Sequence, residues 1–222
     1  MGGSPTYLDP IVIPLIQGPR ILDVGCGFGR WGYLCTTNYW ETHNPPQPPA
    51  VPEITGCDGY LPNVYLARRS SSYTRVIHTI FPPLPFKDNS FDTVLLLEVI
   101  EHLNDGDGRQ LIDESKRVAS YRVVISTPNW SAFREAHTTI TGWNPLEAHL
   151  SYWPRPVLRR LEFKLYGAGW RPGGRYWRGA LRRARLLSLY DRGIRPSLMS
   201  LSRHLPFFAE DIVGFWEKRQ II

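Results

Sequence analysis

The sequence predicts an α/β fold: a doubly wound, mostly parallel sheet of seven strands with an antiparallel edge strand. Three observations support this fold class. Short apolar strand segments alternate with helical segments, a glycine-rich turn joins the first strand to the first helix, and the last two strands follow each other without a recognisable crossover helix. Repeated strand–helix units imply parallel strands, whereas two strands without a crossover helix favour an antiparallel pair at one edge of the sheet.

The predicted elements are placed by short apolar runs between turn signals. The strands are expected at residues 21–24, 54–57, 75–78, 93–97, 122–126, 163–166 and 212–217. The helices are expected at residues 31–38, 64–70, 109–118 and 156–161. The first strand runs directly into the glycine turn, and a proline-rich turn at 82–85 precedes the fourth strand.

Two stretches interrupt this alternation. Residues 44–52 contain five prolines, which predicts an extended surface loop with polyproline character, either a stiff insertion or a recruitment motif. Residues 168–210 contain nine arginines against two acids. If the flanking strands are antiparallel, this basic insertion emerges at the same end of the sheet as the active site. It would then form a lid or a platform for a phosphate-bearing acceptor, or a solvated helix without such a role.

Length and composition bound the remaining alternatives. With 222 residues, 42% of them hydrophobic, residues 1–222 are predicted to form a single domain that carries the two insertions. The longest apolar run is too short to span a membrane and the N-terminus lacks the pattern of a signal peptide, so a cytoplasmic location is expected. Three cysteines without metal-ligand spacing predict neither disulfides nor a zinc site. The formal charge of +6 favours contact with an anionic partner.

The glycine turn after the first strand predicts a ligand-binding loop. Gly25, Gly27 and Gly29 let the backbone turn sharply and approach a ligand without clashes from Cβ atoms. Asp23 stands two residues before the first glycine, where a carboxylate can meet an ammonium group but would repel a pyrophosphate. This favours S-adenosylmethionine (SAM), whose methionyl group carries an ammonium, over a dinucleotide. A purely structural glycine turn is the alternative.

A second acid stands at the end of the second strand. Asp58 lies between Cys57 and Gly59, where a carboxylate is placed to accept hydrogen bonds from both hydroxyls of a ribose. The separation from the glycine turn is longer than usual for this arrangement, and the proline-rich loop accounts for the excess. Asp58 is therefore predicted to bind the ribose of the cofactor.

Several motifs in sequence order carry a resemblance to a known family. They are Asp23 to Gly29, Asp58, Leu84-Pro85-Phe86 with Asn89-Ser90-Phe91-Asp92, and Glu98-Val99-Ile100-Glu101-His102-Leu103. Together they resemble the motifs of class I SAM-dependent methyltransferases, in particular the group that contains the ubiquinone-pathway O-methyltransferases. The resemblance covers residues 8–167 and implies a Rossmann-like seven-stranded sheet with SAM as the cofactor.

The resemblance also implies a set of cofactor contacts. Backbone groups of Gly25, Cys26 and Gly27 would meet the methionyl end of SAM, and the carbonyl of Leu97 would accept its amine. The family often has an aspartate for the adenine amino group where this chain has Ile80, so apolar packing and backbone groups near Phe81 are expected to hold the adenine. The predicted cofactor-binding residues are Asp23, Gly25, Cys26, Gly27, Gly29, Asp58, Gly59, Ile80, Phe81 and Leu97.

Two acids and a histidine follow the strand at 93–97, at the end of the sheet where open α/β folds carry their chemistry. If a helix begins there, the i, i+3, i+4 spacing of Glu98, Glu101 and His102 places all three on one face. Such a group suits a divalent cation such as Mg²⁺, Mn²⁺ or Zn²⁺, or it works without a metal, with His102 as the base. The remaining alternative is a helix start whose acids favour the helix dipole.

Residues further along the chain extend this cluster. Ser126-Thr127-Pro128-Asn129 follows the next strand, and His149 comes after it. The order of the two glutamates and the two histidines resembles that of the small-RNA 3′-terminal 2′-O-methyltransferases, and by this resemblance His149 would be the fourth metal ligand. The predicted catalytic residues are Glu101, His102 and His149, and the predicted metal ligands are Glu98, Glu101, His102 and His149.

These observations lead to three hypotheses for the function. The first is SAM-dependent O-methylation of a small or lipid-like, hydroxylated acceptor of anionic character. The second is metal-dependent 2′-O-methylation of an RNA ribose, and the third is a SAM-binding accessory protein without catalysis. The basic insertion is compatible with RNA and also with peripheral contact with a membrane.

Overall fold

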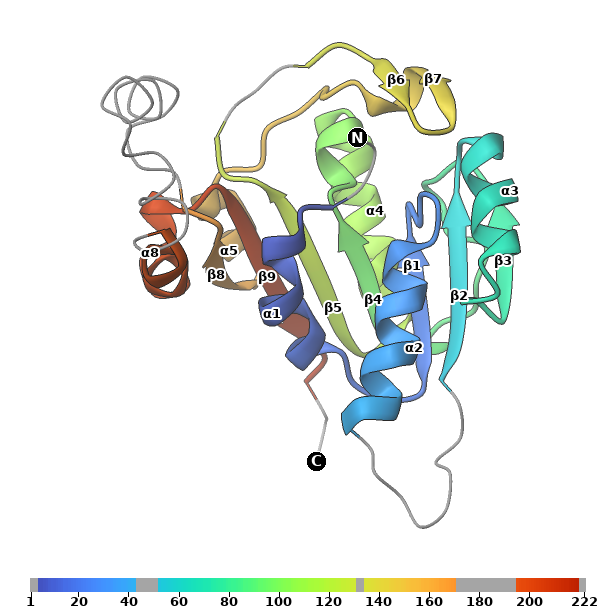
Figure 1. The fold of residues 1–222 in the computed structure, drawn as a ribbon, viewed down its shortest axis with the longest axis horizontal. Coiled ribbons are helices and arrows are strands. Elements are labelled where there is room, and N and C mark those ends of the chain that lie inside the picture. The colour runs from blue at the N-terminus through green and yellow to red at the C-terminus, as the bar shows by residue number, and fades with distance from the viewer. Residues whose placement is uncertain (1–3, 43–51, 131–133, 171–194, 220–222) are drawn as a thin grey trace.

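A single seven-stranded sheet forms the centre of the chain (Figure 1). The computed structural model describes residues 4–42, 52–130, 134–170 and 195–219. The strand order is β3-β2-β1-β4-β5-β9-β8. The strands of this sheet are β1 (Arg20–Val24), β2 (Glu53–Asp58), β3 (Arg75–His78), β4 (Phe91–Leu97), β5 (Ala119–Pro128), β8 (Lys164–Ala168) and β9 (Asp211–Glu217).

The predicted fold class is confirmed, down to the seven strands and the antiparallel pair. Strands β1 to β5 pair in parallel, and β9 runs antiparallel to both of its neighbours, β5 and β8. The reversed strand therefore lies one position in from the edge, and β8 forms the edge itself. Sequence order alone could not place β9 inside β8, because the pairing depends on where the long connection returns to the sheet.

Helices cover both faces of the sheet. The longer ones are α2 (Arg30–Thr42), α3 (Leu61–Arg69), α4 (Asp105–Val118), α5 (Arg155–Arg160) and α8 (Arg195–Ser202). The α4 helix begins at a favourable cap, because the side chain of Asn104 accepts a hydrogen bond from the backbone N–H of Asp107. All four predicted helices exist, whereas α8 and the N-terminal segment of η1 (Thr6–Leu8), α1 (Asp9–Val12) and η2 (Ile13–Leu15) were not predicted.

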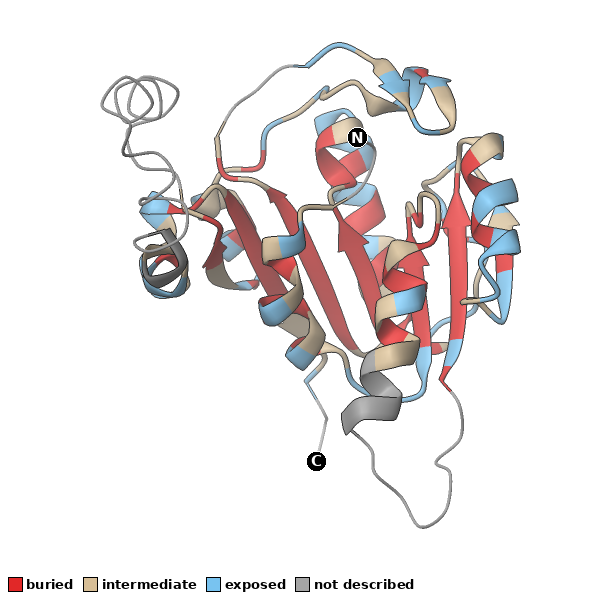
Figure 2. Cartoon of the chain, viewed as in Figure 1, coloured by how far each residue is buried: buried red, intermediate tan, exposed pale blue. Residues whose placement is uncertain are grey.

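The strands are buried on both faces, as Figure 2 shows by their colour. Alternate residues of one strand enter different cores: Leu22 packs with Leu111 of α4 on one face, and Ile21 packs with the N-terminal segment and Trp31 of α2 on the other. A parallel sheet needs such cover on both sides, which explains the nearly continuous apolar run of β4.

A small hairpin stands beyond the carboxyl ends of the strands (Figure 1). It consists of β6 (His137–Thr139) and β7 (Gly142–Asn144), and the short helix η4 (Pro145–Glu147) follows it. The hairpin is tied to α3, because Tyr60 Oη donates to the carbonyl of Trp143 at 2.7 Å and Thr141 Oγ1 donates to Asn63 Oδ1 at 2.8 Å. No local sequence pattern predicted this hairpin.

The two predicted insertions are only partly described. The proline-rich loop at 44–52, except for its last residue, and the arginine-rich part at 171–194 lie outside the described residues. The ends of the basic insertion are described: β8 and β9 are antiparallel, so the insertion leaves and re-enters the sheet at the end that carries the carboxyl termini of β1, β2 and β4. Within the described ranges, no helix is both long and apolar enough to cross a membrane.

Candidate active site

A cavity of about 580 Å³ opens at the carboxyl ends of the parallel strands. It lies where β1 is flanked by β2 on one side and β4 on the other, the position at which the strand order reverses and open α/β sheets bind their ligands. Its walls come from the glycine turn after β1, from the ends of β2 and β4, from the N-terminal segment and from the residues that follow β7.

The glycine turn forms the floor of the cavity. Gly25, Cys26 and Gly27 line it, and the N–H groups of Gly25 and Cys26 both donate to the carbonyl of Cys57, at 2.8 and 3.0 Å. Gly25 has φ +69°, and a Cβ there would lie 2.7 Å from Val99 Cγ2. Gly29 was predicted to bind the cofactor, but it does not line the cavity. Its φ of +104° and its closeness to Tyr73 and Ala67 give it a role in the turn instead.

Asp58 lies at the end of β2, where a ribose-binding acid was predicted. It lines the cavity, and its carboxylate accepts hydrogen bonds from the N–H of Tyr60 at 2.7 Å, the N–H of Gly27 at 2.9 Å and Asn63 Nδ2 at 3.3 Å. Burial raises the pKa of Asp58, and these three donors oppose the rise. The donors fix the carboxylate beside the glycine turn, so the two parts of the predicted cofactor site are joined directly.

Asp23 occupies a different place from the one predicted. Its side chain does not line the cavity and instead accepts a hydrogen bond of 2.6 Å from Tyr73 Oη. The same hydroxyl accepts from the N–H of Gly32 at 3.1 Å, so Asp23 and Tyr73 link β1 to the first turn of α2. Burial raises the pKa of Asp23 to about 7. The structure therefore gives Asp23 a supporting role behind the glycine turn, and the predicted contact with the methionyl ammonium does not follow from it.

The far end of the cavity is lined by the residues that were predicted to contact the adenosine group. Gly59, Ile80, Phe81 and Leu97, which were predicted to bind the cofactor, line the cavity, and so does Leu146 of η4. A Cβ on Gly59 would lie 3.1 Å from the side chains of both Ile80 and Leu146, so these two residues meet over the bare backbone of this glycine. Ile80 is 67% exposed, which agrees with an apolar edge that a planar base could cover.

Glu98 departs from the helical arrangement that the sequence suggested. The helix after β4 is the short η3 (Ile100–His102), and Glu98 itself has φ +58°, a left-handed conformation that is uncommon for a side chain of this size. Its carboxylate accepts a hydrogen bond of 2.7 Å from Ser126 Oγ. The prediction that Glu98, Glu101 and His102 share one helical face is therefore wrong, because no helix begins at Glu98.

Glu101, His102 and His149 come together nevertheless. Each offers one ligand atom, and these three atoms lie within 4.8 Å of one another. The rings of the two histidines meet edge to face with 4.9 Å between their centroids. His102 Nδ1 donates to the carbonyl of Ala148 at 3.1 Å, which leaves Nε2 with its lone pair. Burial lowers the pKa of His102 to about 4, so the ring is neutral at neutral pH.

The carboxyl group of Glu101 has no hydrogen-bond partner among the described residues. Glu101 is 2% exposed, and the hydroxyl of Thr127, which lies near this carboxyl, is also without a partner there. Burial raises the pKa of both Glu98 and Glu101 well above the usual range; the charges of Glu101 and Asp211 add to the rise at Glu98, and that of Asp211 to the rise at Glu101. A divalent cation fits this group: an unsatisfied carboxylate and two imidazoles are suitable ligands, and the carbonyl of Ala148 orients one of the rings.

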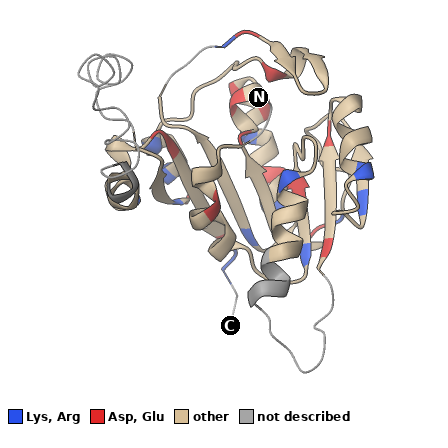
Figure 3. Cartoon of the chain, viewed as in Figure 1, with Lys and Arg blue, Asp and Glu red and all other residues tan. Residues whose placement is uncertain are grey.

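Acidic side chains outnumber basic ones near this end of the cavity. Glu98, Glu101, Glu210 and Asp211 line it, against Arg134 from the described residues. Figure 3 shows acidic segments at the upper ends of β2 and β9. An anionic acceptor was predicted, and these residues in their ionised forms would repel one unless a bound cation compensated for them.

Comparisons with known proteins bear on this arrangement. A family model described as a methyltransferase domain matches residues 22–122, a range that contains the glycine turn, Asp58 and the Glu98–His102 segment. The chain carries a methyltransferase domain of the class I, SAM-dependent type. No curated protein matches its sequence.

Solved structures share the fold of this methyltransferase. A SAM-dependent methyltransferase from Archaeoglobus fulgidus is 19% identical, with 94% of this chain and 90% of that chain covered and a TM-score of 0.56. One from Mesorhizobium loti is 15% identical, with 96% and 98% covered and the same TM-score. The match to the PH0226 protein from Pyrococcus horikoshii OT3, at 22% identity and TM-score 0.45, spans only about half of each chain (55% and 56%).

Several residues of the methyltransferase site were not predicted. Ser4, Tyr7 and Arg30 line the cavity, and Tyr7 Oη donates to Asp211 Oδ2 at 2.5 Å. Leu146 and Asn63 complete the adenosine end. Only Arg30 carried a signal in the sequence, because it follows the glycine turn directly; the others reach the cavity through pairings of distant segments.

Proposed function

We propose that this methyltransferase transfers the methyl group of SAM to a hydroxyl group of a small or lipid-like acceptor bound next to Glu101, His102 and His149. The observation that supports the proposal is the Glu101 carboxyl, which is buried on the cavity wall without a partner among the described residues. Leaving a buried polar group unpaired costs about 1–3 kcal/mol. Native structures keep such groups mainly where a ligand or a reaction uses them.

The chemistry assigns one proton to His102. In the transfer, a lone pair of the acceptor oxygen forms the new bond to the methyl carbon while the carbon–sulfur bond breaks, which leaves S-adenosylhomocysteine as a neutral thioether. The hydroxyl proton must leave as this bond forms, and His102 Nε2 is the free lone pair beside the cavity that can accept it. Ala148 holds the ring in the required tautomer through Nδ1, and the cavity walls position the oxygen for in-line attack.

The test is a comparison of His102→Gln with the native chain. Release of S-adenosylhomocysteine is measured with a panel of phenols, hydroxylated lipids and RNA oligonucleotides, and SAM binding is measured by calorimetry. We expect turnover to fall about 10²- to 10⁴-fold, the usual contribution of a positioned base, while SAM affinity stays the same. Unchanged turnover in His102→Gln would refute the role of this residue.

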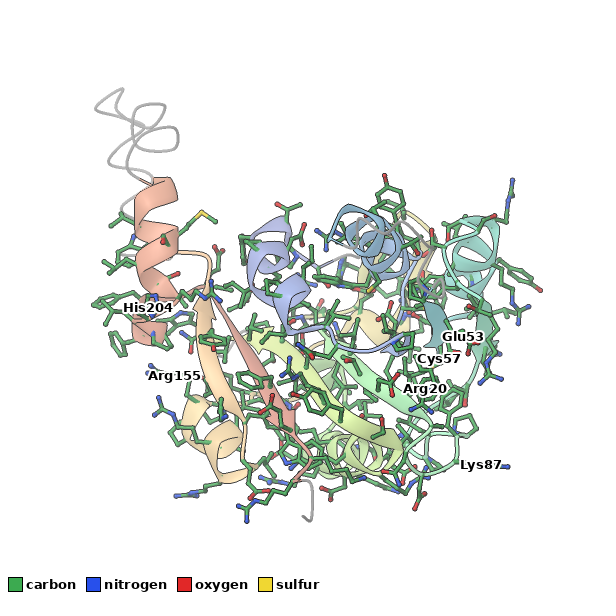
Figure 4. The ribbon with its side chains drawn as sticks, turned by 90° about the horizontal axis from the view of Figure 1, so that it is seen from below. Arg20, Glu53, Cys57, Lys87, Arg155 and His204 are labelled. Carbon is green, nitrogen blue, oxygen red and sulfur yellow. The ribbon has the colours of Figure 1, made fainter. Side chains whose placement is uncertain are left out.

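A matched control for this test is His204→Gln. His204 is exposed and lies beside α8, separated by the breadth of the sheet from Cys57 of β2 (Figure 4). This substitution should leave both turnover and SAM binding as they are.

A second candidate function is metal-dependent methylation of a ribose hydroxyl at the end of an RNA. The close approach of Glu101, His102 and His149 favours it, together with the excess of acids around them. These three residues would hold the ion, and Glu98, whose carboxylate is bonded to Ser126, would not belong to this group. A divalent cation bound there would draw charge from the acceptor oxygen and lower the pKa of the hydroxyl.

Two measurements separate the candidates. The paramagnetic resonance spectrum of added Mn²⁺ should change on binding to the native chain but not to Glu101→Gln, whether or not an acceptor is present. RNA with a terminal 2′,3′-diol should be methylated, RNA with a 3′-phosphate should not, and a chelator should abolish the activity. RNA methylation that survives the chelator, or none at all, removes the second candidate. An anionic acceptor and peripheral membrane contact stay predictions.

A further inference from the structure

We infer that Arg30 binds the carboxylate of the methionyl group of the cofactor, and that this contact selects SAM from analogues that lack the carboxylate. The inference rests on SAM as the cofactor and is independent of the acceptor. It concerns the first residue of α2, which follows the glycine turn and lines the cavity together with Gly25, Cys26 and Gly27.

Of the two terminal nitrogens of the Arg30 guanidinium, one is hydrogen-bonded within the described residues and the other is not. Its Nη2 donates to both carboxylate oxygens of Asp9, at 2.6 Å each. Its Nη1 is buried and has no hydrogen-bond partner among the described residues. The guanidinium carbon lies 4.9 Å from the ring centroid of Trp31, so packing also restricts the group. An arginine that is fixed on one side and unpaired on the other is prepared to bind an anion with the free side.

The order of the site along the sheet identifies the anion. Asp58 at the end of β2 is the ribose-binding position, and Glu101 beyond the end of β4 marks the reacting end. The turn after β1 lies between them, so the amino-acid part of the cofactor belongs beside Gly25 to Gly27 and Arg30. This part carries an ammonium and a carboxylate, and a guanidinium attracts only the carboxylate. The N-terminus of α2, where Arg30 lies, also favours a negative charge.

The N-terminal segment positions this arginine. Asp9 of α1 holds Nη2, and Ser4 Oγ accepts a hydrogen bond of 3.0 Å from Trp31 Nε1, next to Arg30 in the chain. Asp9 is 21 residues away from Arg30 in sequence and does not line the cavity. It is therefore a positioning residue, and its removal should leave the free side of the guanidinium available to the cofactor.

The experiment compares two ligands by calorimetry: SAM and decarboxylated SAM, which differ by the carboxylate alone. The native chain should bind SAM about 10- to 100-fold more tightly, the range expected for a charge-assisted contact. In Arg30→Gln the affinities for the two ligands should become equal within about twofold, chiefly through the loss of SAM affinity. Arg30→Lys should keep part of the preference, because a lysine can still meet the carboxylate as a point charge.

The matched control is Asp9→Asn, which breaks the ion pair and keeps Arg30. It should retain most of the preference for SAM. If Arg30 only anchored the N-terminal segment, Arg30→Gln and Asp9→Asn would each weaken the binding of both ligands equally. The preference of the native chain for SAM over decarboxylated SAM would then persist in both variants. That result, or a native chain that binds both ligands alike, overturns the inference. A native chain that binds neither SAM nor decarboxylated SAM would instead count against SAM as the cofactor.

Discussion

The two halves of the cavity differ in how their polar groups are satisfied. In the cofactor half, Asp58 accepts three hydrogen bonds, the glycine turn bonds its N–H groups to Cys57 and Asp58, and Arg30 Nη1 is buried without a partner among the described residues. In the acceptor half, the Glu101 carboxyl has no partner among the described residues and Glu98 holds a left-handed backbone conformation. Strain and unpaired groups lower stability, so a site keeps them where a bound molecule uses them: one cation in the cofactor half, and an acid with a strained neighbour in the acceptor half.

The largest effects should come from exchanging one acid in each half. Glu101→Gln is expected to lower turnover by about 10²-fold or more and to leave SAM affinity within about twofold, because Glu101 lines the cavity and its carboxyl lies beside the two histidines of the proposed acceptor site. Asp58→Asn is expected to weaken SAM binding about 10- to 100-fold, because an amide has only one oxygen that can accept hydrogen bonds where the carboxylate has two. Release of S-adenosylhomocysteine at saturating SAM and calorimetry separate the two effects. If both variants changed both quantities equally, the division of the cavity would be wrong.

The same division explains which parts of the site the sequence could predict. The position of the glycine turn, Asp58, Gly59 and Leu97 at one cavity could be predicted because each lies within a few residues of the end of a parallel strand, and the fold brings those ends together. All seven strands of the sheet were found for a similar reason: their apolar runs are local signals. Parallel pairing then fixes the edge at which the ligand binds.

The missing parts depend on contacts that no local signal reveals. The prediction that Asp23 contacts the cofactor did not foresee its hydrogen bond to Tyr73, which lies 50 residues away in the sequence. The prediction that Glu98 lies on a helical face failed because bonds to Ser126 on the neighbouring strand hold its backbone in a left-handed conformation. The hairpin and the N-terminal segment approach the cavity from outside the sheet. Their residues Leu146 and Tyr7 therefore carried no pattern that indicated a site.

An intermediate effect is expected from Asp23 through pH. Its pKa is raised to about 7 in the folded chain from an ordinary value near 3.8, so the folded state binds the proton more tightly than the unfolded state. Protonation thus stabilises the fold, and this contribution is fully present below pH 3.8 and is lost as the pH rises towards 7. Between pH 5 and 8 the loss should be about 2–3 kcal/mol, and Asp23→Asn should lack it.

Urea unfolding of the native chain and of Asp23→Asn at the two pH values measures this difference. The variant should also bind SAM about as well as the native chain, in contrast to Asp58→Asn, because its side chain lies behind the cavity wall. A drop in SAM affinity as large as that of Asp58→Asn would restore the contact with the methionyl ammonium that the sequence suggested. If the free energy of unfolding depended on pH in the same way in the native chain and in the variant, Asp23 would not be the group that takes up the proton.

The smallest effect tests the link between the halves. Thr141 of the hairpin donates a hydrogen bond to Asn63, which in turn donates one to Asp58 of the cofactor half. The chain that follows the hairpin reaches the acceptor half, where Glu147 lines the cavity and the ring of His149 contacts that of His102. Thr141→Val removes two hydrogen bonds, the one to Thr139 within the hairpin and the one to Asn63; the loss of the second, worth about 1 kcal/mol, should lower SAM affinity roughly fivefold. Thr138→Val, at an exposed position of the same hairpin, is the control and should change nothing. If Thr141→Val also lowers turnover at saturating SAM, the hairpin sets the position of His102 as well, and the two halves are coupled through it.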